Sequence, residues 1–388
     1  MRLNVGVIFG GKSVEHEISI ISATEIMGFM DENKYKVIPI YIDKDNVWYT
    51  GDHLKSIINY RDIALVKRYA KRVALVNTGH GFALQTLGFI KRNVCPVDVI
   101  LPIGHGTFME DGSLQGYLNM IGIPYCGCGV TASAIGQDKV LMKEVLEFNG
   151  IPTPKYVWFY KKEWVNDRKA ILDKLNDFSY PLFVKPASLG SSIGISKVDN
   201  ESMLSKAIKD ALVYDKKIII EEGIRNVKEV NISVLGDYER LEVSGIEEIN
   251  SNDEFYTFKE KYVSDCSKLS KNKVRKSKPI ISKEMIEDLK NLALRTFKTI
   301  NASGVARIDF LVDEKNMKIY VNEINTIPGD LAGWLWIEKK KSQSELVDDL
   351  INLAIKKYKN SKDYEYTISG NLLEQFDILD GKKINRKK

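Results

Sequence analysis

Cysteine, histidine and long apolar runs are all scarce in this sequence of 388 residues. Its four cysteines, Cys95, Cys126, Cys128 and Cys266, are too few for a disulfide framework, which indicates a reduced, cytosolic protein. The Cys126-x-Cys128 pair lacks a second ligand pair, and only four histidines are present, so no zinc site is expected. No apolar run approaches the ~18–20 residues of a membrane span, and residues 1–11 show no secretory pattern. The sequence therefore predicts a cytoplasmic protein without membrane segments.

Positive charge is in only slight excess, because 57 Lys and Arg face 52 Asp and Glu, for a formal net charge of +5. Residues 382–388 hold five basic residues and no acidic one, which leaves 52 of each sign in the rest of the chain. A neutral body lacks the electrostatic footprint of a nucleic-acid-binding protein. The basic run belongs to a tail, residues 359–388, that looks like an appendage to the rest of the chain, and whether it docks on the core stays open from the sequence.

The hydrophobic pattern alternates between strands and helices, which is typical of an α/β protein. Short apolar runs predict buried strands at residues 5–9, 36–42 and 97–102. Longer runs with helical spacing predict helices at residues 283–300 and 344–358. Between them, residues 250–278 form a polar, lysine- and serine-rich stretch without a period, and a loop of that length is either functional or mobile.

Two nucleotide-binding patterns occur outside the structural context that they require. Residues 6–13 match the phosphate-loop pattern G-x-x-x-x-G-K-S, but Val7, Ile8 and Phe9 belong to the predicted strand and not to a loop after it. Residues 127–132 resemble a dinucleotide fingerprint, but the acidic residues about 20 positions further on fall inside a predicted helix. Neither pattern therefore supports a nucleotide site.

A predicted hairpin, residues 306–312 and 318–329, carries polar side chains on one face. With a tip at residues 314–318, three cross-strand pairs share this face: Arg307 with Asn325, Asp309 with Glu323, and Leu311 with Val321. Two carboxylates and an amide oxygen converge there, and these are ligands suited to Mg²⁺. A solvated hairpin face is the alternative. The apolar opposite face and the Pro-Gly turn that ends the segment favour the metal site.

A second segment, residues 183–194, leads from a strand that carries Lys185 into a glycine- and serine-rich loop. Backbone N–H groups in such a loop can close over phosphate, and the lysine supplies a positive charge. A flexible loop between two strands is the alternative, and the sequence of this segment alone is compatible with both.

Together with Asp138-Lys139 and Glu221-Glu222, these segments resemble the ATP-grasp superfamily and, within it, the D-alanine–D-alanine ligase family. The resemblance runs from about Leu3 to Tyr358 and includes five motifs in order: GGKSVEHEIS at 10–19, HG…EDG…QG at 105–116, the lysine-to-serine loop, EKY at 260–262, and NEINTIPG at 322–329. It implies a three-domain α/β fold, the ATP-grasp fold with a Rossmann-like N-terminal domain. The expected domains are residues 1–126, 127–223 and 224–358, with ATP held between the second and third.

The resemblance also implies roles for individual residues. ATP would be held by Lys139 and Lys185 at the phosphates, Glu221 at the adenine amine, Glu229 at the ribose, and the neighbouring Glu222 and Lys261. Two Mg²⁺ ions, with Mn²⁺ as a substitute, would be bound by Asp309, Glu323 and Asn325. The first amino acid and the chemistry would depend on Glu15, Ser191, Tyr262 and Arg307, with Glu15 linked by hydrogen bonds to Ser191 and Tyr262. His105 would contribute to the substrate site.

The implied reaction is an ATP-dependent ligation of a carboxylate to an amine. The first amino acid's carboxylate attacks the γ-phosphate, and the second amino acid's amine then displaces phosphate from the acylphosphate. A lid must exclude water from such an intermediate, and residues 250–278 are our candidate for it. The resemblance further implies amino-acid substrates and a homodimer. Glu15 as an ordinary acid in the first turn of a helix, and His105 as an ordinary loop histidine, are the alternatives for these two residues.

The departures from the family pattern cluster where the second amino acid should bind. After the Pro-Gly turn, the family's carboxylate-binding serine position falls on Trp334, next to Leu335, and an acid, Asp330, follows Gly329. An indole offers one donor on a bulky ring and does not replace a hydroxyl at a carboxylate. Trp334 either contacts the substrate or packs under the last helix.

Three functions therefore remain open from the sequence. The first is D-alanyl-D-alanine formation for cell-wall synthesis, and the second is a related ligation in a specialised pathway with a different acceptor amine. The third is a nucleotide-binding homologue without catalysis. Retention of the whole set of lysines, Arg307 and metal-binding residues argues against the last of these.

Overall fold

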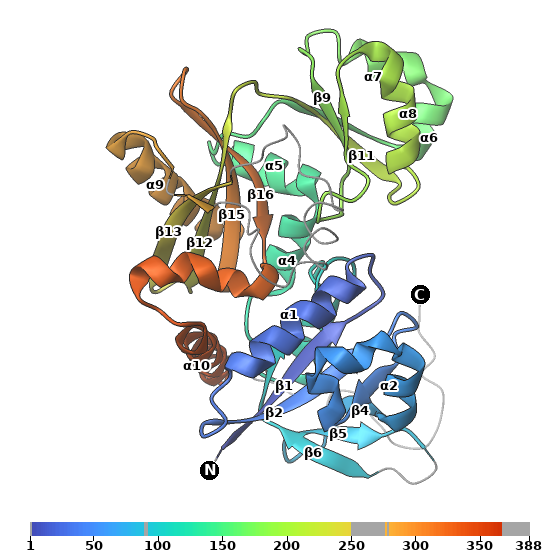
Figure 1. The fold of residues 1–388 in the computed structure, drawn as a ribbon, viewed down its shortest axis with the longest axis vertical. Coiled ribbons are helices and arrows are strands. Elements are labelled where there is room, and N and C mark those ends of the chain that lie inside the picture. Colours follow the sequence, from blue (N-terminus) through green and yellow to red (C-terminus); the bar gives the residue numbers. More distant parts are fainter. Residues whose placement is uncertain (1, 89–91, 250–275, 278, 367–388) are drawn as a thin grey trace, which may run out of the picture.

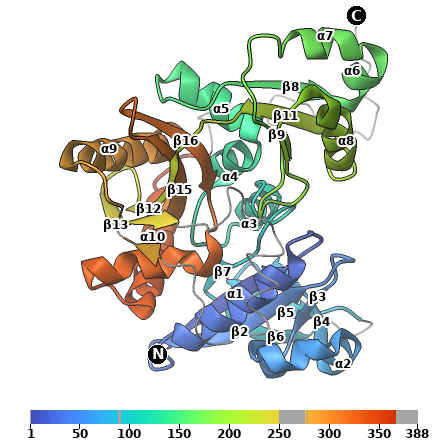
Figure 2. The same ribbon diagram turned by 45° about the horizontal axis from the view of Figure 1, so that its top comes forward.

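The computed structural model describes residues 2–88, 92–249, 276–277 and 279–366. Within these residues, helices and strands alternate along the chain and form three sheets, which confirms the predicted α/β class. Figures 1 and 2 show the N-terminal and central sheets at opposite ends of the molecule, with the C-terminal sheet to one side between them.

The N-terminal sheet is parallel at one end and antiparallel over the rest, in the order β6-β5-β4-β3-β2-β1-β7. Its parallel part is β2 (Tyr35–Ile42), β1 (Leu3–Gly10) and β7 (Val99–Pro102). The antiparallel part contains β3 (Trp48–Thr50), β4 (Lys71–Asn77), β5 (Phe82–Thr86) and β6 (Asn93–Val97). Since Val7, Ile8 and Phe9 are completely buried in β1, residues 6–13 do not form a phosphate loop.

The helices of this region are α1 (His16–Phe29), α2 (Ile63–Tyr69) and α3 (Ser113–Ile121), with 3₁₀ turns at Asp52–Lys55 and Ile57–Arg61. α1 packs on β1 and places Glu15, which precedes its first residue, at the carboxyl end of that strand. In α/β sheets this end of the strands is where ligands bind.

The central sheet is antiparallel throughout, in the order β10-β9-β11-β8. Its strands are β8 (Tyr156–Tyr160), β9 (Leu182–Pro186), β10 (Ser196–Val198) and β11 (Lys217–Glu222). α6 (Lys161–Asn166), α7 (Arg168–Asp173) and α8 (Glu201–Ala211) accompany this sheet. α8 buries Leu204, Ala207, Ile208 and Ala211, whose spacing places them on one helical face.

The C-terminal sheet has the order β14-β13-β12-β15-β16. Its strands are β12 (Lys228–Gly236), β13 (Leu241–Ile249), β14 (Lys276–Ser277), β15 (Gly304–Asp313) and β16 (Lys318–Asn325). α9 (Lys283–Thr299) lies against it, a 3₁₀ segment, η4 (Gly329–Lys339), follows β16, and α10 (Gln343–Ser361) ends the fold. α9 and α10 confirm the two helices expected at 283–300 and 344–358 to within a few residues.

Two hydrophobic cores join segments that are far apart in the sequence. α4 (Val130–Gln137) and α5 (Lys139–Phe148) contribute Ala132, Met142 and Leu146 to the core of the C-terminal sheet. α10 packs on the N-terminal core through residues such as Leu346 and Leu350. Figures 1 and 2 show α4 and α5 between the C-terminal and central sheets. The N-terminus of α5 therefore lies where an ATP-grasp ligand is expected, while the exact domain boundaries stay a prediction.

The β15–β16 hairpin confirms two of the three predicted cross-strand pairs. Arg307 lies opposite Asn325 and Asp309 opposite Glu323. The pairing of Leu311 with Val321 was wrong, because the register shifts between Asp309 and Phe310, and Leu311 instead lies opposite Tyr320. Asn322 is the extra residue on β16, and a β-bulge of this kind cannot be read from a two-residue period.

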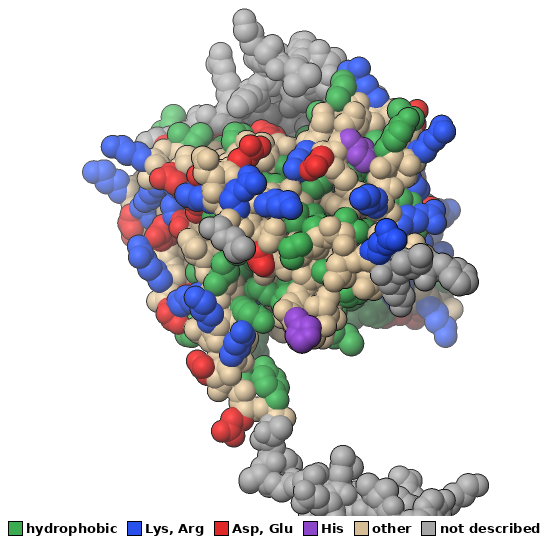
Figure 3. Space-filling view, turned by 90° about the horizontal axis from the view of Figure 1, so that it is seen from below, with side chains coloured by type: hydrophobic (Ala, Val, Ile, Leu, Met, Phe, Trp, Pro, Cys, Tyr) green, Lys and Arg blue, Asp and Glu red, His purple; other side chains and the backbone are tan. Residues whose placement is uncertain are grey.

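The surface carries charges of both signs. In Figure 3, basic and acidic side chains lie interspersed over the face seen from below. A search of the described residues for a helix with the length and hydropathy of a membrane span finds none.

Candidate nucleotide and amino-acid site

The predicted metal ligands come together on β15 and β16. Arg307 donates two hydrogen bonds to Asp309, from Nε to Oδ1 at 2.7 Å and from Nη2 to Oδ2 at 2.8 Å. Asn325 Nδ2 donates to the same Oδ2 at 3.1 Å. Glu323 lies opposite Asp309, with its Oε2 at 3.7 Å from Lys139 Nζ. The two carboxylates and the lysine expected at ATP phosphates therefore share one site.

The chemistry of these side chains fits a hard divalent cation, since Asp309, Glu323 and Asn325 all offer oxygen ligands. Among the described residues, no cluster of three or more His, Cys, Asp and Glu side chains is arranged to hold a metal ion. The predicted set contains two carboxylates and an amide, so it would rely on substrate oxygens and water to complete a coordination shell, as Mg²⁺ sites commonly do.

Lys139 is fixed at the first turn of α5. Asp138 caps this helix by accepting hydrogen bonds from the backbone N–H groups of Val140 and Leu141. The Lys139 ammonium donates to the Leu189 carbonyl at 2.6 Å, so the loop after β9 is held against the start of α5. The predicted glycine- and serine-rich loop therefore lies beside Lys139, next to the carboxylates of the C-terminal sheet.

Glu221 lies between two buried lysines. Lys185 Nζ donates to its Oε2 at 2.6 Å, and Lys143 Nζ lies 3.2 Å from its Oε1. Burial alone would raise the pKa of Glu221, but the two positive charges outweigh it and lower the pKa to about 2. For Lys143, burial lowers the pKa, and Glu221 counteracts this shift. We call these three residues the lysine–glutamate cluster.

Lys143 was missed by the sequence analysis. It lies four residues after Lys139, and therefore on nearly the same face of α5, among the buried Val140, Met142 and Leu146. A lysine at a core position of an amphipathic helix was the available signal, because buried lysines are rare without a partner.

Two further residues predicted to bind the nucleotide, Glu222 and Glu229, are less buried than Glu221. Glu222 accepts a hydrogen bond from the backbone N–H of Ser179 at 2.9 Å. Glu229 is exposed on β12. Their contact with a nucleotide stays a prediction. Lys261 and Tyr262 lie outside the described residues, as does the candidate lid at 250–278 apart from β14.

The first-substrate residues lie where the N-terminal region meets the loop after β9. Ser191 Oγ donates a hydrogen bond to Glu15, as predicted, although 175 residues separate them. Glu15 is 4% exposed. Gly106 allows this close approach, since its φ is +75° and a Cβ there would lie 2.6 Å from Glu15 Oε2. The buried carboxylate is thus held by loops from two parts of the chain.

Glu110 is a second buried carboxyl beside Glu15. Its Oε2 accepts from the Gly106 N–H at 2.7 Å, and its Oε1 accepts from the Ile327 N–H at 3.3 Å. Burial and then the nearby Glu15 charge raise the pKa of Glu110 to about 8. The EDG motif contains Glu110, but its position against the NEINTIPG segment was not foreseen.

His105 is also buried and neutral. Burial lowers the pKa of His105 to about 4. Its backbone N–H donates to Ser19 Oγ at 2.8 Å, and its Nε2 lies 3.3 Å from Ser22 Oγ. These contacts to α1 orient the ring near Glu110, whose Oε2 is 3.9 Å from His105 Nδ1. His105 is therefore a buried loop residue of the site region, and its contact with substrate stays a prediction.

The acceptor side is built on an unusual turn. Asp330, Leu331 and Ala332 have φ values of 47°, 54° and 53°, a left-handed run that L-residues rarely adopt. Gln343 Nε2 donates to the Asp330 carbonyl at 2.7 Å and supports the turn from α10. Sparsely populated backbone of this kind is often found at functional sites.

Trp334 has a partner within the protein. Its Nε1 donates to Glu247 Oε2 at 2.9 Å, and the ring is half-buried between η4 and β13. Leu335 is 3% exposed, so its side chain belongs to the interior. The hydrogen bond to Glu247 joins Trp334 to β13, and both alternatives, contact with the substrate and packing under the last helix, stay predictions.

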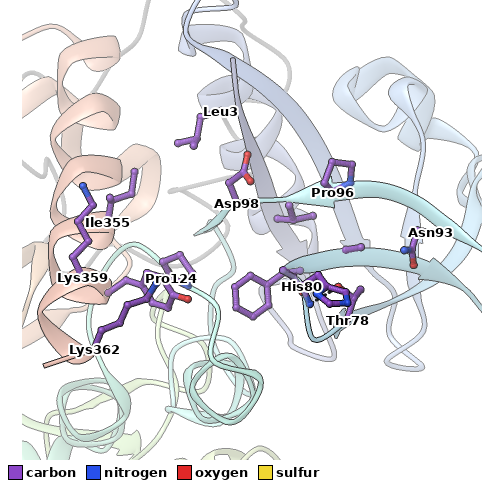
Figure 4. Close-up of a pocket in the computed structure, with 15 residues that line it drawn as sticks. Leu3, Thr78, His80, Asn93, Pro96, Asp98, Pro124, Ile355, Lys359 and Lys362 are labelled. Carbon is purple, nitrogen blue, oxygen red and sulfur yellow. Dashed lines mark hydrogen bonds between the residues drawn. The ribbon is translucent and has the colours of Figure 1, made fainter. Parts of the chain in front are cut away.

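A separate cavity of about 570 Å³ opens between α10 and the antiparallel end of the N-terminal sheet. Figure 4 shows Ile355 and Lys359 of α10, and Lys362 directly after it, facing His80 and Asp98 across it. None of the predicted site residues lines this cavity. It is therefore distinct from the candidate site.

Comparison with known proteins decides the family. Residues 4–128 match the family model described as the D-ala D-ala ligase N-terminus, and residues 145–352 match the D-ala D-ala ligase C-terminus. The chain belongs to the D-alanine–D-alanine ligase family. The resemblance based on the motifs is thereby confirmed, and the chain is an enzyme of a class that forms dipeptides with ATP.

Individual relatives cover nearly the whole chain. The D-alanine–D-alanine ligase of Thermosipho africanus is 38% identical over 96% of this chain and 98% of its own length. That of Acetivibrio thermocellus is 40% identical over 94% of this chain and 99% of its own length. These ligases therefore share every region that contains the candidate site.

Solved structures show the same fold. The D-alanine–D-alanine ligase of Coxiella burnetii is 31% identical, with a TM-score of 0.78 over 93% of this chain and 96% of its own. The VanG D-Ala:D-Ser ligase of Enterococcus faecalis is 30% identical, with a TM-score of 0.76 over 91% of this chain and 100% of its own. The family fold therefore includes ligases named for different acceptors.

Proposed function

We propose that this protein joins two molecules of D-alanine in an ATP-dependent reaction that releases ADP and phosphate. The observation that carries the proposal is the meeting of Lys139, on α5, with Asp309 and Glu323, on the C-terminal sheet. Lys139 Nζ is 3.7 Å from Glu323 Oε2. This arrangement suits a nucleotide whose phosphates contact lysines on one side and carboxylate-bound cations on the other.

The nucleotide would be bound by residues of two sheets. Lys139 and Lys185 would contact phosphates, Glu221 would accept a hydrogen bond from the adenine amine, and Glu229 would bind the ribose. Asp309, Glu323 and Asn325 would hold Mg²⁺, which neutralises phosphate charge and for which Mn²⁺ can substitute. Glu222 and Lys261 would complete the nucleotide site.

In the first step, a carboxylate oxygen of the first D-alanine attacks the γ-phosphorus of ATP, and ADP leaves. Glu15, supported by Ser191 and Tyr262, would bind the ammonium group and orient the carboxylate. The neutral His105 imidazole would lie near this substrate. The acylphosphate must then be protected from hydrolysis, and we assign the exclusion of water to residues 250–278.

In the second step, the amine nitrogen of the second D-alanine attacks the acyl carbon, and phosphate leaves with the oxygen that attacked ATP. The amine loses its proton as the peptide bond forms. Arg307 would stabilise the negative charge that develops on the acyl oxygen. The 3₁₀ segment η4, with Gly329, Asp330, Trp334 and Leu335, would form the wall of the acceptor site.

D-alanine is the favoured acceptor for two reasons. Three relatives that are 38–40% identical to this chain and cover more than nine-tenths of it are named D-alanine–D-alanine ligases, whereas the VanG D-Ala:D-Ser ligase is 30% identical. Trp334, the main departure from the family pattern, bonds to Glu247, so its presence does not require a different acceptor. Cell-wall synthesis in the cytoplasm follows from this activity.

Product analysis tests the proposal. The protein is incubated with ATP, Mg²⁺ and a mixed pool of D- and L-amino acids, and the products are identified by mass spectrometry. We expect D-alanyl-D-alanine with one phosphate released per dipeptide. Absence of ATP-dependent phosphate release with every amino acid would contradict the assignment, and a different main dipeptide would correct the acceptor.

Paired variants test the metal-binding residues. Asp309→Asn and Glu323→Gln are each expected to reduce kcat by about 10²-fold or more, because they remove cation ligands at the phosphates. Asp313→Asn is the matched control, since Asp313 lies on the same strand but bonds to Asn316 at the hairpin tip. Equal activity of all three variants would contradict the metal assignment.

The assembly state belongs to the same proposal. We expect a homodimer, and sedimentation equilibrium at micromolar concentration measures it. A single species of 44.1 kDa, the mass of one chain, would show that the monomer is the active form if activity is retained.

A further inference from the structure

The lysine–glutamate cluster contains two lysines and one carboxylate. Lys185 Nζ lies 2.6 Å from Glu221 Oε2, and Lys143 Nζ lies 3.2 Å from Glu221 Oε1. One lysine is enough to neutralise one carboxylate, so Glu221 alone does not explain why a second lysine is buried. A ligand anion that binds one of the two lysines in place of Glu221 would explain it.

The two lysines differ in their access to such a ligand. Lys185 lies on β9, directly before the loop that meets Lys139, and its side chain is 10% exposed. The Lys143 side chain is 0% exposed, in the second turn of α5. Lys185 can therefore turn toward a phosphate, while Lys143 has no path out of the interior.

The sheet register keeps Lys143 and Glu221 in place. On β11, Ile219 lies opposite Lys185 of β9, so Glu221 is two residues further along the same face. Tyr156 of β8 lies opposite Glu221 on the other side, and Lys143 Nζ is 5.6 Å from the centre of its ring. The aromatic ring and the α5 backbone hold the ammonium beside Glu221 whether or not Lys185 moves.

We propose that Lys143 is the permanent counter-charge of Glu221 and thereby determines nucleotide base preference. While Lys185 binds phosphate, Lys143 keeps Glu221 an ionised hydrogen-bond acceptor for the amino group of adenine. Without Lys143, Glu221 takes up a proton and can donate to the carbonyl oxygen of guanine. Lys143 is a positioning residue, since it acts through Glu221, and the inference rests on the proposed function.

The groups that face Glu221 determine how the effect depends on pH. Lys143 of α5, Lys185 of β9 and Tyr156 of β8 face Glu221 directly. Glu147 of α5 acts indirectly, because its charge influences Lys143 and Tyr156. Only the lysines stabilise the ionised form of Glu221. When one is absent and the other is engaged by phosphate, burial dominates, and the proton is retained to higher pH.

The test is steady-state kinetics of the full chain with ATP and with GTP between pH 6 and 9, at saturating D-alanine. For Lys143→Met we expect a rise in the KM for ATP of about tenfold, a kcat within about twofold, and a tenfold smaller preference for ATP over GTP. The lost preference should be greatest at low pH. Lys143→Arg should retain most of the preference because it keeps the charge.

Lys217→Met is the matched control. Lys217 is also a buried lysine on the central sheet, paired with Asp138 at 2.8 Å and lying over the Trp158 ring. Its removal should lower thermal stability as the Lys143 variant does, but leave the ATP-over-GTP preference unchanged. A loss of preference in both variants would overturn the inference.

A double variant separates positioning from a structural role. In a Glu221→Gln background, Lys143→Met should cause no further loss of preference, since an amide needs no counter-charge. If Lys143→Met does not yield folded protein, Lys143→Gln is measured in its place. A wild-type preference in these variants, or a lower kcat with the preference unchanged, would overturn the inference. An inactive wild-type protein would instead contradict the proposed function.

Discussion

Two buried carboxyl groups, Glu221 and Glu110, behave in opposite ways. Both lie in the interior of the candidate site, at 3% and 8% exposure. Two lysines lower the pKa of Glu221 to about 2, against the effect of burial. Burial and the Glu15 charge raise the pKa of Glu110 to about 8, where two backbone N–H groups are its hydrogen-bond donors.

The comparison shows that two carboxyl groups of similar burial differ because of their partners: two lysines outweigh burial at Glu221, whereas at Glu110 burial and the Glu15 charge act in the same direction. Backbone N–H groups lower the pKa of a carboxyl group, but less than burial raises it at Glu110. In the proposed function, the adenine base would therefore meet an ionised carboxylate at Glu221. Glu110, which accepts hydrogen bonds from Gly106 of the N-terminal region and Ile327 of the C-terminal region, is mostly neutral at pH 7.

The largest expected difference between the two sites is in the response to amide substitution. Glu221→Gln leaves two lysines without a counter-charge and should lower the free energy of unfolding by about 3–5 kcal/mol. Glu110→Gln replaces a largely neutral acid and weakens one backbone hydrogen bond, so a loss of about 1 kcal/mol is expected at pH 7. Denaturant unfolding of both variants measures this. Equal losses would contradict the comparison.

The pH dependence of stability should have opposite signs at the two residues. Glu110 binds its proton more tightly in the folded state, so its contribution is present below pH 4.5 and is lost as the pH rises through about 8. Glu221 binds its proton less tightly in the folded state, so its contribution is present above pH 4.5 and is lost as the pH falls toward 2.

Thermal unfolding of the wild-type protein and the two amide variants across pH 5–9 measures the alkaline side of this difference. The melting temperature of the wild type should fall relative to that of Glu110→Gln as the pH rises. A constant difference between these two proteins over the range would show that Glu110 does not titrate there.

A smaller effect is expected when the like charge beside Glu110 is removed. Glu15→Gln should lower the pKa of Glu110, although burial keeps it above its ordinary value. The loss of stability that starts above pH 4.5 should therefore end at a lower pH, and be smaller in total, in Glu15→Gln than in the wild type. An unchanged midpoint would show that burial alone raises the pKa.

The smallest effect concerns a third buried carboxylate, Glu247, which has the neutral indole of Trp334 as a donor. Trp334→Phe removes this hydrogen bond and should lower the free energy of unfolding by about 1–2 kcal/mol. Because Trp334→Phe keeps an aromatic ring in the proposed wall of the acceptor site, the KM for the second D-alanine should change less than about twofold. A rise of tenfold or more would show that the indole N–H itself contacts the second D-alanine.

The hairpin shows how far the sequence determines this site. A two-residue period was enough to place Arg307 opposite Asn325 and Asp309 opposite Glu323, since both pairs lie on the same side of the bulge. It failed at Leu311 because the bulge at Asn322 shifts the register. The antiparallel strands β3 to β6 were not predicted, because they are short and include polar and half-exposed positions.

The spacing of residues along the sequence could not predict contacts between distant segments. Lys143 of α5 meets Glu221 of β11, and Trp334 of η4 meets Glu247 of β13, only after the helices and sheets have packed. The hydrogen bond from Ser191 to Glu15 was expected only from the family resemblance. Local pattern therefore predicted the long helices, the buried strands and the polar face of one hairpin, and tertiary packing determined the charge environment of each carboxyl group.

Isotope transfer tests the central claim, that ATP activates the carboxylate of the first amino acid before the second attacks. D-alanine with ¹⁸O in both carboxylate oxygens is supplied with ATP and Mg²⁺, and the released phosphate is examined by mass spectrometry. The account predicts one ¹⁸O in each phosphate, with the other retained in the new peptide bond. Dipeptide formed together with unlabelled phosphate would contradict it.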